Sequence, residues 1–301
     1  MPGAGFPRLS GELSHELSFE AVGTRWCIAT EDPLDAATRA AVDGCIEDYS
    51  LLWSRFRADS LVARLARQAG ACRLPQHAAD LAAVYAALHR ATGGRVSPLV
   101  GASLERLGYD AHYSLVPSGP PLPAPAWDGR LDWSGPVLAT SAPLLLDVGA
   151  AGKGQLVDLV AGVLRERGYG RCIVDAGGDM LIRTGEPVRV ALEHPYDSSR
   201  AVGVLELADQ AVAASAANRR AWGDGLHHVL DAHTGQAVET VVASWATAAS
   251  ALVADGVATG LFFASPAELA QEPCLSGFSC VRIFSDGRAE YWGTLKGELF
   301  A

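Results

Sequence analysis

The sequence predicts an α+β fold built on a mixed β-sheet with packed helices. Two observations predict it. Strand-like segments occur both before and after helix-like segments, without the strict alternation of repeated βαβ units. The chain also has 301 residues, of which 49% are hydrophobic, and this is enough to bury one large core. We therefore expect a single domain over residues 19–301, preceded by an N-terminal tail over residues 1–18.

The first part of the chain is predicted to hold one strand and three helices. Alternating apolar and polar residues predict the strand at 19–30. Apolar residues at helical spacing predict helices at 35–51 and 78–92. Ser60 is a suitable N-cap for a short helix over 60–68.

The rest of the chain begins with a predicted loop. Proline and glycine concentrate over residues 115–136, which predicts a surface loop or insertion. Beyond it, short apolar runs bounded by turn residues predict strands, and longer segments with helical spacing predict helices. The predicted strands are 144–148, 171–175, 188–192, 201–207 and 226–230, the predicted helices are 155–167 and an alanine-rich 248–264, and residues 281–284 and 290–292 are predicted to form a hairpin.

Composition argues against several classes of protein. The formal net charge of −10 disfavours a nucleic-acid partner, because phosphate contacts need clustered basic residues. The six cysteines include no Cys-x-x-Cys pair, which predicts buried free thiols rather than zinc ligands or disulfides. The start lacks a basic segment followed by an apolar one, and no stretch has the ~18 apolar residues of a spanning helix, so we expect a cytoplasmic protein with no membrane partner.

A first candidate site lies in LDVGAAGKGQLVDLV, over residues 146–160. Here a strand, a loop of small residues and a helix follow one another. Small residues let the backbone approach a phosphate, amides at a helix start point outward, and Lys153 adds a positive charge. The alternative is a tight turn with a solvated lysine, because the spacing matches neither a Walker loop nor a dinucleotide-binding glycine motif.

A second candidate lies in VDAGGDMLI, over residues 174–182, where a strand ends in two acids that flank a pair of glycines. Glycine tolerates positive φ, so the turn can present Asp175 or Asp179 to a site. The same acids can equally cap backbone amides of their own turn.

A third candidate is the pair Asp255 and Thr259, four residues apart on an otherwise apolar helix and therefore on one face. A lone carboxylate is costly to bury there unless it is paired or bound to a cation. Two hard oxygens suit magnesium, which takes few protein ligands. The alternative is a partly exposed aspartate with Thr259 bonded back to its own helix.

A fourth candidate lies in LHHVLDAHTGQAV, over residues 226–238. His228 is a candidate acid or base near neutral pH, although a lone histidine is more often structural. Asp231 begins a turn that readily bonds its own amides.

Seven short motifs occur along the chain in one order. They are VGT at Val22, SRF at Ser54, VSPLVG at Val96, DVGAAGKG at Asp147, DAGGD at Asp175, HVLDAHTG at His228 and DGVAT at Asp255. Each motif alone is weak, but seven in the right order with sensible gaps are strong. In this order the chain resembles the ApbE family of FAD:protein FMN transferases, from Gly23 to about Ser265.

The resemblance implies an ApbE-like fold and a magnesium-dependent transferase that moves FMN from FAD to a Ser or Thr hydroxyl of a target flavoprotein and releases AMP. FAD is then the substrate, and the acceptor flavoprotein carries a short Ser/Thr-containing motif. By the same resemblance, His228 and Asp255 are catalytic, the metal ligands are Asp255, Thr259 and the backbone carbonyl of Ala150, and the FAD-binding residues are Val22, Phe56, Val96, Ser97, Pro98, Asp147, Lys153 and His228.

The chain departs from the family pattern at several positions, which indicates a divergent member. The departures are Val22 for methionine, Phe56 for tyrosine, Ser97 for aspartate, Asp175 for asparagine, Ala216 for glycine and Ala232 for proline. Most of them fall on the flavin or adenosine side rather than on the metal side. Two alternatives use the same residues: a magnesium-dependent FAD pyrophosphatase, in which water replaces the protein hydroxyl, and a flavin-binding protein without turnover.

Overall fold

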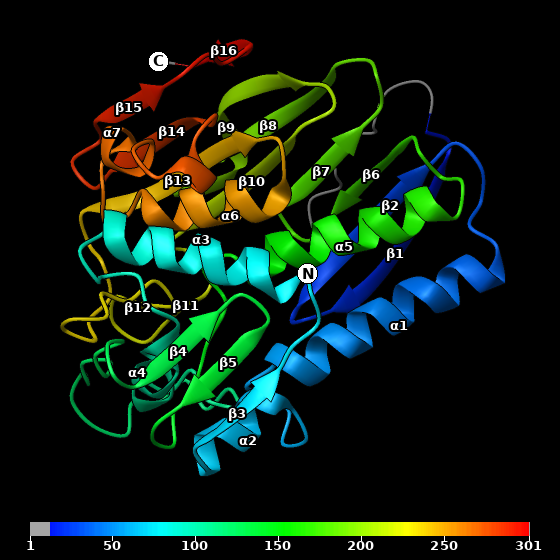
Figure 1. The fold of residues 1–301 in the computed structure, drawn as a ribbon. Coiled ribbons are helices and arrows are strands. Elements are labelled where there is room, and N and C mark those ends of the chain that lie inside the picture. Colours follow the sequence, from blue (N-terminus) through cyan, green and yellow to red (C-terminus); the bar gives the residue numbers. More distant parts are fainter. Residues whose placement is uncertain (1–12, 301) are drawn as a thin grey trace.

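The computed structural model describes residues 13–300. Its largest feature is an eight-stranded sheet in the order β1-β2-β6-β7-β10-β13-β14-β15 (Figure 1). These strands are β1 (His15–Ala21), β2 (Thr24–Thr30), β6 (Cys172–Asp175), β7 (Met180–Arg183), β10 (Ala211–Ala216), β13 (Val241–Ala248), β14 (Ser279–Phe284) and β15 (Ala289–Trp292). The α+β class is confirmed. The sheet differs from the expected mixed one, because every ladder between its described strands is antiparallel.

Helices cover one face of this sheet. Figure 1 shows α3 (Ala78–Ala91), α5 (Gly152–Glu166) and α6 (Ala251–Gly260) in front of the strands, with α1 (Ala36–Trp53) beside α5. Strand residues such as Val174 and Leu181 join the buried cluster under these helices. The residues next to them in sequence therefore point to the opposite face.

The opposite face is covered by a smaller sheet. It contains β8 (Val188–His194), β9 (Asp197–Leu207) and β16 (Gly297–Leu299), in the order β16-β9-β8. Ile173 and Ile182 of the large sheet pack into a second buried cluster with Leu192 and Leu205 of this small sheet. Because both faces are buried, the central strands are mostly apolar, which explains the short apolar runs in the sequence.

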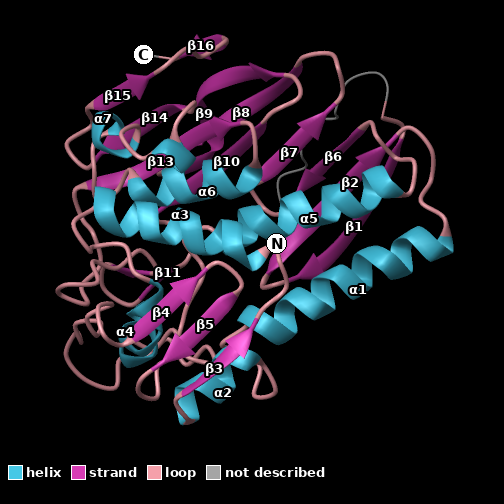
Figure 2. Cartoon of the chain, viewed as in Figure 1, coloured by secondary structure: helices cyan, strands magenta, loops and turns pink. Residues whose placement is uncertain are grey.

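The remaining elements lie below the helical layer in Figures 1 and 2. A three-stranded sheet has the order β3-β5-β4, and a third buried cluster contains Leu104, Tyr109 and Trp222. The elements here are α2 (Leu61–Arg67), β3 (Gly70–Arg73), η1 (Pro98–Val100), α4 (Gly101–Arg106), β4 (Leu131–Ser134), β5 (Val137–Thr140), β11 (Ala221–Trp222) and β12 (Leu226–His227), while α7 (Pro266–Leu269) and η2 (Pro273–Leu275) follow α6.

Several predicted elements are confirmed. The helices at 35–51, 60–68 and 78–92 correspond to α1, α2 and α3, and Ser60 caps α2 by accepting a hydrogen bond from the amide of Ala63. The predicted hairpin near the C-terminus is the pair β14 and β15. Helix α5 begins at Gly152 rather than at residue 155, so Lys153 lies in its first turn.

The prediction of one opening strand over 19–30 was wrong, because this segment belongs to a hairpin of two strands, β1 and β2. Val22 and Gly23 turn the chain with φ of 49° and 71°, and β1 begins at His15, within the predicted tail. The loop predicted at 115–136 contains β4, which pairs with β5. The strand predicted at 144–148 forms no ladder; it is an extended segment whose Leu144 amide bonds to the carbonyl of Leu65.

Two further boundaries were wrong near the C-terminal half. The strand predicted at 226–230 is reduced to β12, followed by an isolated bridge between Leu230 and Ala237. The alanine-rich helix predicted at 248–264 is shorter, because β13 runs through Ala248 and α6 spans Ala251–Gly260. The six cysteines are free thiols as expected, but only Cys172 and Cys280 are buried, while Cys27, Cys45 and Cys72 are half-buried and Cys274 is exposed. No helix among residues 13–300 has the length and apolar character needed to cross a bilayer.

Candidate active site

Helices α5 and α6 are joined by two carboxylates, each of which accepts hydrogen bonds from amides at the start of the other helix. Asp158 of α5 accepts hydrogen bonds from the amides of Ala251 and Leu252, in the first turn of α6, at 2.9 Å each. Asp255 of α6 accepts one from the amide of Gly154, in the first turn of α5, at 2.8 Å. Both carboxylates therefore lie where helix dipoles favour negative charge.

The close approach of the two helices requires glycine at position 154. A Cβ there would come within 2.7 Å of the Cβ of Asp255 and closer still to the carbonyl oxygen of Ala251. The amide of Gly154 also donates to Asp255 rather than to the carbonyl of Ala150, four residues before it. That carbonyl is consequently outside the helical ladder.

Asp255 is buried, with 4% of its surface exposed. Burial raises the pKa of its carboxyl well above the usual range, the nearby charge of Asp179 raises it further, and Lys153 opposes both. Thr259 lies one turn along α6, and its hydroxyl is 3.4 Å from that of Ser215 at the end of β10. The predicted pairing of a carboxylate and a hydroxyl on one helical face is thus present, and the exposed-edge alternative for Asp255 was wrong.

The turn between β6 and β7 brings a second carboxylate to the same place. Asp179 is fully buried and forms an ion pair with Lys153 through Oδ2. Its Oδ1 is buried and has no hydrogen-bond partner. Asp175 instead caps its own turn, because its Oδ1 accepts from the amide of Gly178 at 3.0 Å. Of the two acids in this motif, Asp175 therefore caps backbone amides, and Asp179 is the one that points toward Lys153.

Asp147 is held by a buried arginine. Arg55 donates to its Oδ2 through Nε at 2.7 Å, and the amide of Gly149 donates to its Oδ1 at 2.7 Å. Burial alone would raise the pKa of Asp147, but the charge and hydrogen bond of Arg55 outweigh burial and lower it. Two buried tyrosines support the loop: Tyr49 donates to the carbonyl of Gly152, and Tyr85 donates to that of Asp147.

Most amides of this loop bond within the protein and are not free for a ligand as the sequence suggested, the amide of Lys153 excepted. Besides Gly149, the amide of Ala150 donates to the Tyr85 hydroxyl, and that of Gly152 donates to the carbonyl of Val148. The amide of Gly154 is used by Asp255. A phosphate bound here would therefore depend mainly on side chains rather than on the start of α5.

The adjacent histidines have different surroundings. His227 uses both ring nitrogens, with Nε2 2.9 Å from the carbonyl of Val238 and Nδ1 3.3 Å from the amide of Val229. His228 has a buried Nδ1 without a partner. Burial, followed by the positive charge of Arg220, lowers the pKa of His228 to about 3. His227 is therefore a satisfied structural histidine, whereas His228 has a ring nitrogen without a partner.

We expect the His228 imidazole to stay neutral between pH 5 and 8, because burial and the charge of Arg220 disfavour its protonated form. Its ring carbon resonance, assigned with a His228→Gln variant, should not titrate in this range in the unliganded protein. A midpoint between pH 6 and 7 would show that the ring is solvated and not desolvated as described here.

Aromatic rings surround Arg55. Its guanidinium carbon lies 4.2 Å from the ring centroid of Phe56 and 4.9 Å from that of Tyr109. Tyr113 stacks in parallel on Phe56 with centroids 5.0 Å apart. Trp222 stacks on Tyr109 at 5.5 Å. Phe56, predicted to face the flavin, therefore contacts rings of its own chain.

Val22 lies at the tip of the hairpin between β1 and β2 and is 41% exposed. Its φ of 49° is unusual for a β-branched residue and marks local strain. A Cβ at Gly23 would lie 3.3 Å from the hydroxyl of Tyr113, so this tip is near the ring that covers Phe56. The structure thus places two predicted flavin-side residues, Val22 and Phe56, next to the same tyrosine.

The segment Val96, Ser97 and Pro98 is largely structural. The Ser97 hydroxyl caps η1 by accepting from the amide of Leu99, and the carbonyl of Pro98 accepts from the amide of Asp147. Val96 is buried, and its amide donates to the Thr92 hydroxyl. Of the three, Ser97 also lines a hollow of about 550 Å³ together with residues that include His89, Trp127 and His233.

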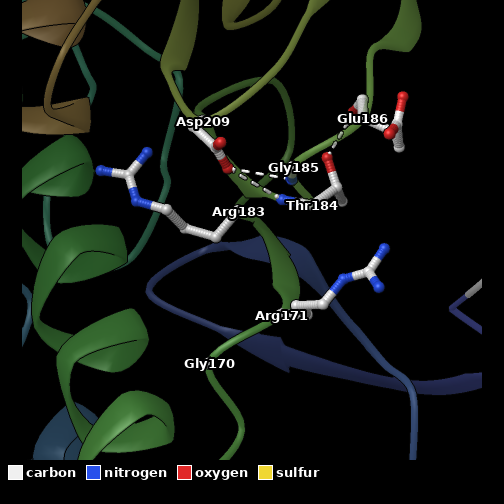
Figure 3. Close-up of a pocket in the computed structure, with 7 residues that line it drawn as sticks. All are labelled: Gly170, Arg171, Arg183, Thr184, Gly185, Glu186 and Asp209. Carbon is white, nitrogen blue, oxygen red and sulfur yellow. Dashed lines mark hydrogen bonds between the residues drawn. The ribbon is translucent and has the colours of Figure 1, made fainter.

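A second hollow, of about 420 Å³, lies at the other end of the sheet (Figure 3). Its walls include Arg171 before β6 and Arg183 at the end of β7, whereas Asp175 and Asp179 lie at the opposite ends of these strands. Asp209 closes its turn by accepting from the amides of Thr184 and Gly185. No residue predicted to bind a ligand lines this hollow.

Among residues 13–300, no group of three or more His, Cys, Asp or Glu side chains is arranged to hold a metal ion. The oxygens near Asp255 are of a different kind. Besides the two acids, the Thr259 hydroxyl lies one turn along α6, and the carbonyl of Ala150 is outside the helical ladder at the start of α5. Such a set fits magnesium better than zinc, because magnesium prefers oxygen and needs few protein ligands.

Arg55 and Arg220 were not predicted as site residues, and Asp179 was predicted only as one of two open choices in its turn, the other being Asp175. Arg55 and Asp179 each pair with a residue that was predicted, Asp147 and Lys153. Arg220 makes no hydrogen bond or ion pair with the rest of residues 13–300, and its charge lowers the pKa of His228. The basic-aromatic turn WSRFRADS was a possible signal for Arg55, but nothing local indicated its partner.

Comparisons with known proteins agree on one family. The ApbE family model matches residues 22–273. A FAD:protein FMN transferase of Vibrio cholerae is 30% identical over 237 residues, which cover 73% of this chain and 71% of that protein. One of Klebsiella pneumoniae is 29% identical over 153 residues, which cover 48% of this chain and only 44% of that protein.

Solved structures share the fold. The flavin transferase ApbE of Vibrio cholerae aligns with a TM-score of 0.73 and 20% identity, covering 94% of this chain and 96% of that one. The ApbE protein of Thermotoga maritima aligns with a TM-score of 0.75 and 20% identity, covering 92% and 96%. At this identity the likeness establishes the architecture, and the chemistry has to be argued from the side chains.

Proposed function

Since the chain belongs to the ApbE family, we propose that it is a FAD:protein FMN transferase, which moves FMN from FAD to a Ser or Thr hydroxyl of an acceptor flavoprotein and releases AMP. One observation carries this proposal. Asp255 and Asp179, two buried carboxylates, lie beside Lys153 and within electrostatic range of each other, and one oxygen of Asp179 lacks a partner. A structural core gives no reason to bury that combination.

Magnesium is part of the proposal, and the residues present fit it. Asp255, Thr259 and the backbone carbonyl of Ala150 would hold the ion, next to the unpartnered Oδ1 of Asp179. Burial, and after it the charge of Asp179, raises the pKa of Asp255 when no cation is bound. Bound magnesium would neutralise charge on the pyrophosphate and on the AMP leaving group.

The chain's own residues supply positioning and proton transfer. Lys153 gives a positive charge beside the pyrophosphate, and Asp179 orients it. The acceptor hydroxyl oxygen attacks the FMN phosphorus, the bond from that phosphorus to the bridging oxygen breaks, and AMP leaves. With a pKa of about 3, His228 is a weak base in the unliganded protein; it would accept the hydroxyl proton once the negative charge of the bound pyrophosphate has raised that pKa. Phosphoryl transfer needs little more than this, because positioning and charge neutralisation carry most of the catalysis.

The proposal is tested by incubating the protein with FAD and a candidate acceptor flavoprotein, with and without magnesium, while AMP release and acceptor mass are followed. We expect a magnesium-dependent gain in acceptor mass equal to one FMN phosphoester, with AMP in equal amount. AMP and free FMN without any mass gain would favour an FAD pyrophosphatase. No AMP with any acceptor would indicate a flavin-binding protein without turnover.

Lys153→Ala is expected to weaken FAD binding by about tenfold at low salt and by less at high salt, because a charge contact to phosphate is screened by ions. The affinity is measured by titration at several ionic strengths. Lys296, the only other lysine of the chain and an exposed one, provides the control, since Lys296→Ala should leave the affinity unchanged. A loss that does not depend on salt would indicate that Lys153 acts through packing around Asp179.

A further inference from the structure

Arg55 has donors that the protein does not use. It lies between α1 and α2, and its side chain is 1% exposed. Nε donates to Asp147, but Nη1 and Nη2 are buried and have no acceptor. Among residues 13–300, these are the only buried arginine or lysine nitrogens without a partner. Buried donors of a charged group are costly to leave unpaired, so an acceptor from outside the chain is expected.

The guanidinium is fixed in orientation as well as in place. Phe56 and Tyr109 contact its planar face, and Trp222 stacks behind Tyr109. Trp222 is itself anchored, because its Nε1 donates to the carbonyl of Leu107 at 2.8 Å. Asp147 occupies only the Nε edge. The side chain is therefore already ordered before any ligand binds. A ligand at the remaining Nη edge would not have to order it, and this favours binding there.

Most other donors of the neighbouring loop are already used; the backbone amide of Lys153 is the exception. The amides of Gly149, Ala150, Gly152 and Gly154 bond within the protein, and Lys153 is paired with Asp179. Two arginines near Asp147 have nitrogens to spare, Arg55 and Arg220, and of the two only Arg55 is held in place by an ion pair and by aromatic rings. A phosphate oxygen is the acceptor that best matches a guanidinium edge, since it carries charge and accepts two parallel hydrogen bonds.

We propose that Arg55 binds a phosphate oxygen of the dinucleotide through Nη1 and Nη2. The proposal rests on the proposed function, which supplies the dinucleotide, and adds to it a binding residue that presents the pyrophosphate from the side of Asp147. Asp147 then acts by positioning Arg55 rather than by touching the phosphate, and the rings of Phe56 and Tyr109 hold the guanidinium flat.

The test uses three ligands that differ in phosphate content, FAD, ADP and riboflavin, with magnesium present. Arg55→Lys keeps a charge for Asp147 but removes the paired Nη groups; Arg55→Met removes the charge as well. We expect Arg55→Lys to weaken FAD and ADP binding by at least about tenfold and to leave riboflavin binding within about twofold. Arg57→Met is the control, because Arg57 lies two residues away in exposed ion pairs with Glu47 and Asp59.

The other outcomes of this experiment would overturn the assignment of Arg55. An equal loss for riboflavin would show that Arg55 acts through ring packing and would overturn the assignment. Unchanged FAD and ADP affinity in Arg55→Lys would overturn it as well, and if Arg55→Met fails to fold, the lysine variant decides alone. A wild-type chain that transfers FMN while Arg55→Lys binds normally refutes this assignment only. A wild-type chain that binds neither FAD nor ADP refutes the proposed function with it.

Discussion

Replacing Asp255 with asparagine is expected to reduce magnesium-dependent FMN transfer by roughly 10³-fold, because a charged ligand that neutralises the reacting phosphates is worth several kcal/mol. The fold should survive. The asparagine oxygen can still accept from the amide of Gly154, and the raised pKa of Asp255 shows that its ionised form is disfavoured in the unliganded protein. Without magnesium, the melting temperature of Asp255→Asn should therefore equal or exceed that of the wild type.

Asp158→Asn is the matched control. Asp158 is the other carboxylate that joins α5 and α6, and it caps the first turn of α6 without facing the site. Burial raises the pKa of Asp158 too, so its charge is not what stabilises the cap. Asparagine has only one side-chain oxygen, however, so one of the two amides of α6 would lose its acceptor, which should lower stability by about 1 kcal/mol and leave transfer within about threefold. We therefore expect Asp255→Asn to lose transfer activity without losing stability, and Asp158→Asn to lose stability without losing transfer activity. Turnover in Asp255→Asn with unchanged magnesium dependence would remove the metal assignment.

The helices were predictable where capping and periodicity are local. Ser60 caps α2 through the amide three residues on, and such a signal is complete within one turn. The boundary between β13 and α6 was not predictable. Ala246, Ala248 and Ala251 are all buried, first in the strand and then in the helix. Alanine fits both environments, so a run of small residues carries no period that separates them.

The extended segment 144–148 shows a second limit. Its apolar residues, Leu144 and Leu146, are buried as a strand would bury them. The backbone instead bonds at Leu144 to Leu65 within α2, and at Asp147 to Pro98. Burial can be read from composition, but the partner of a backbone amide is decided by the tertiary fold.

Candidate site residues were predictable when their own segment made them unusual. A carboxylate on an apolar helix indicated Asp255, and a lysine among glycines indicated Lys153. Arg55 and Asp179 could not be assigned in the same way, because their significance depends on partners 92 and 26 residues away. The sequence also suggested free amides at the start of α5. In the structure, the amides of Gly149, Ala150 and Gly154 donate hydrogen bonds to side chains brought there by the tertiary fold.

His228→Gln is expected to slow FMN transfer by about 10²- to 10⁴-fold with little change in FAD affinity, because general-base assistance acts on the rate and not on binding. Single-turnover transfer and equilibrium FAD titration separate the two. His227→Gln is the control. Both ring nitrogens of His227 are bonded, so its loss should lower stability by about 1–3 kcal/mol and leave transfer within a few fold. If the two variants lost activity and stability alike, the pair would be structural. Phosphoryl transfer would then depend on charge neutralisation by Lys153 and the carboxylate pair alone.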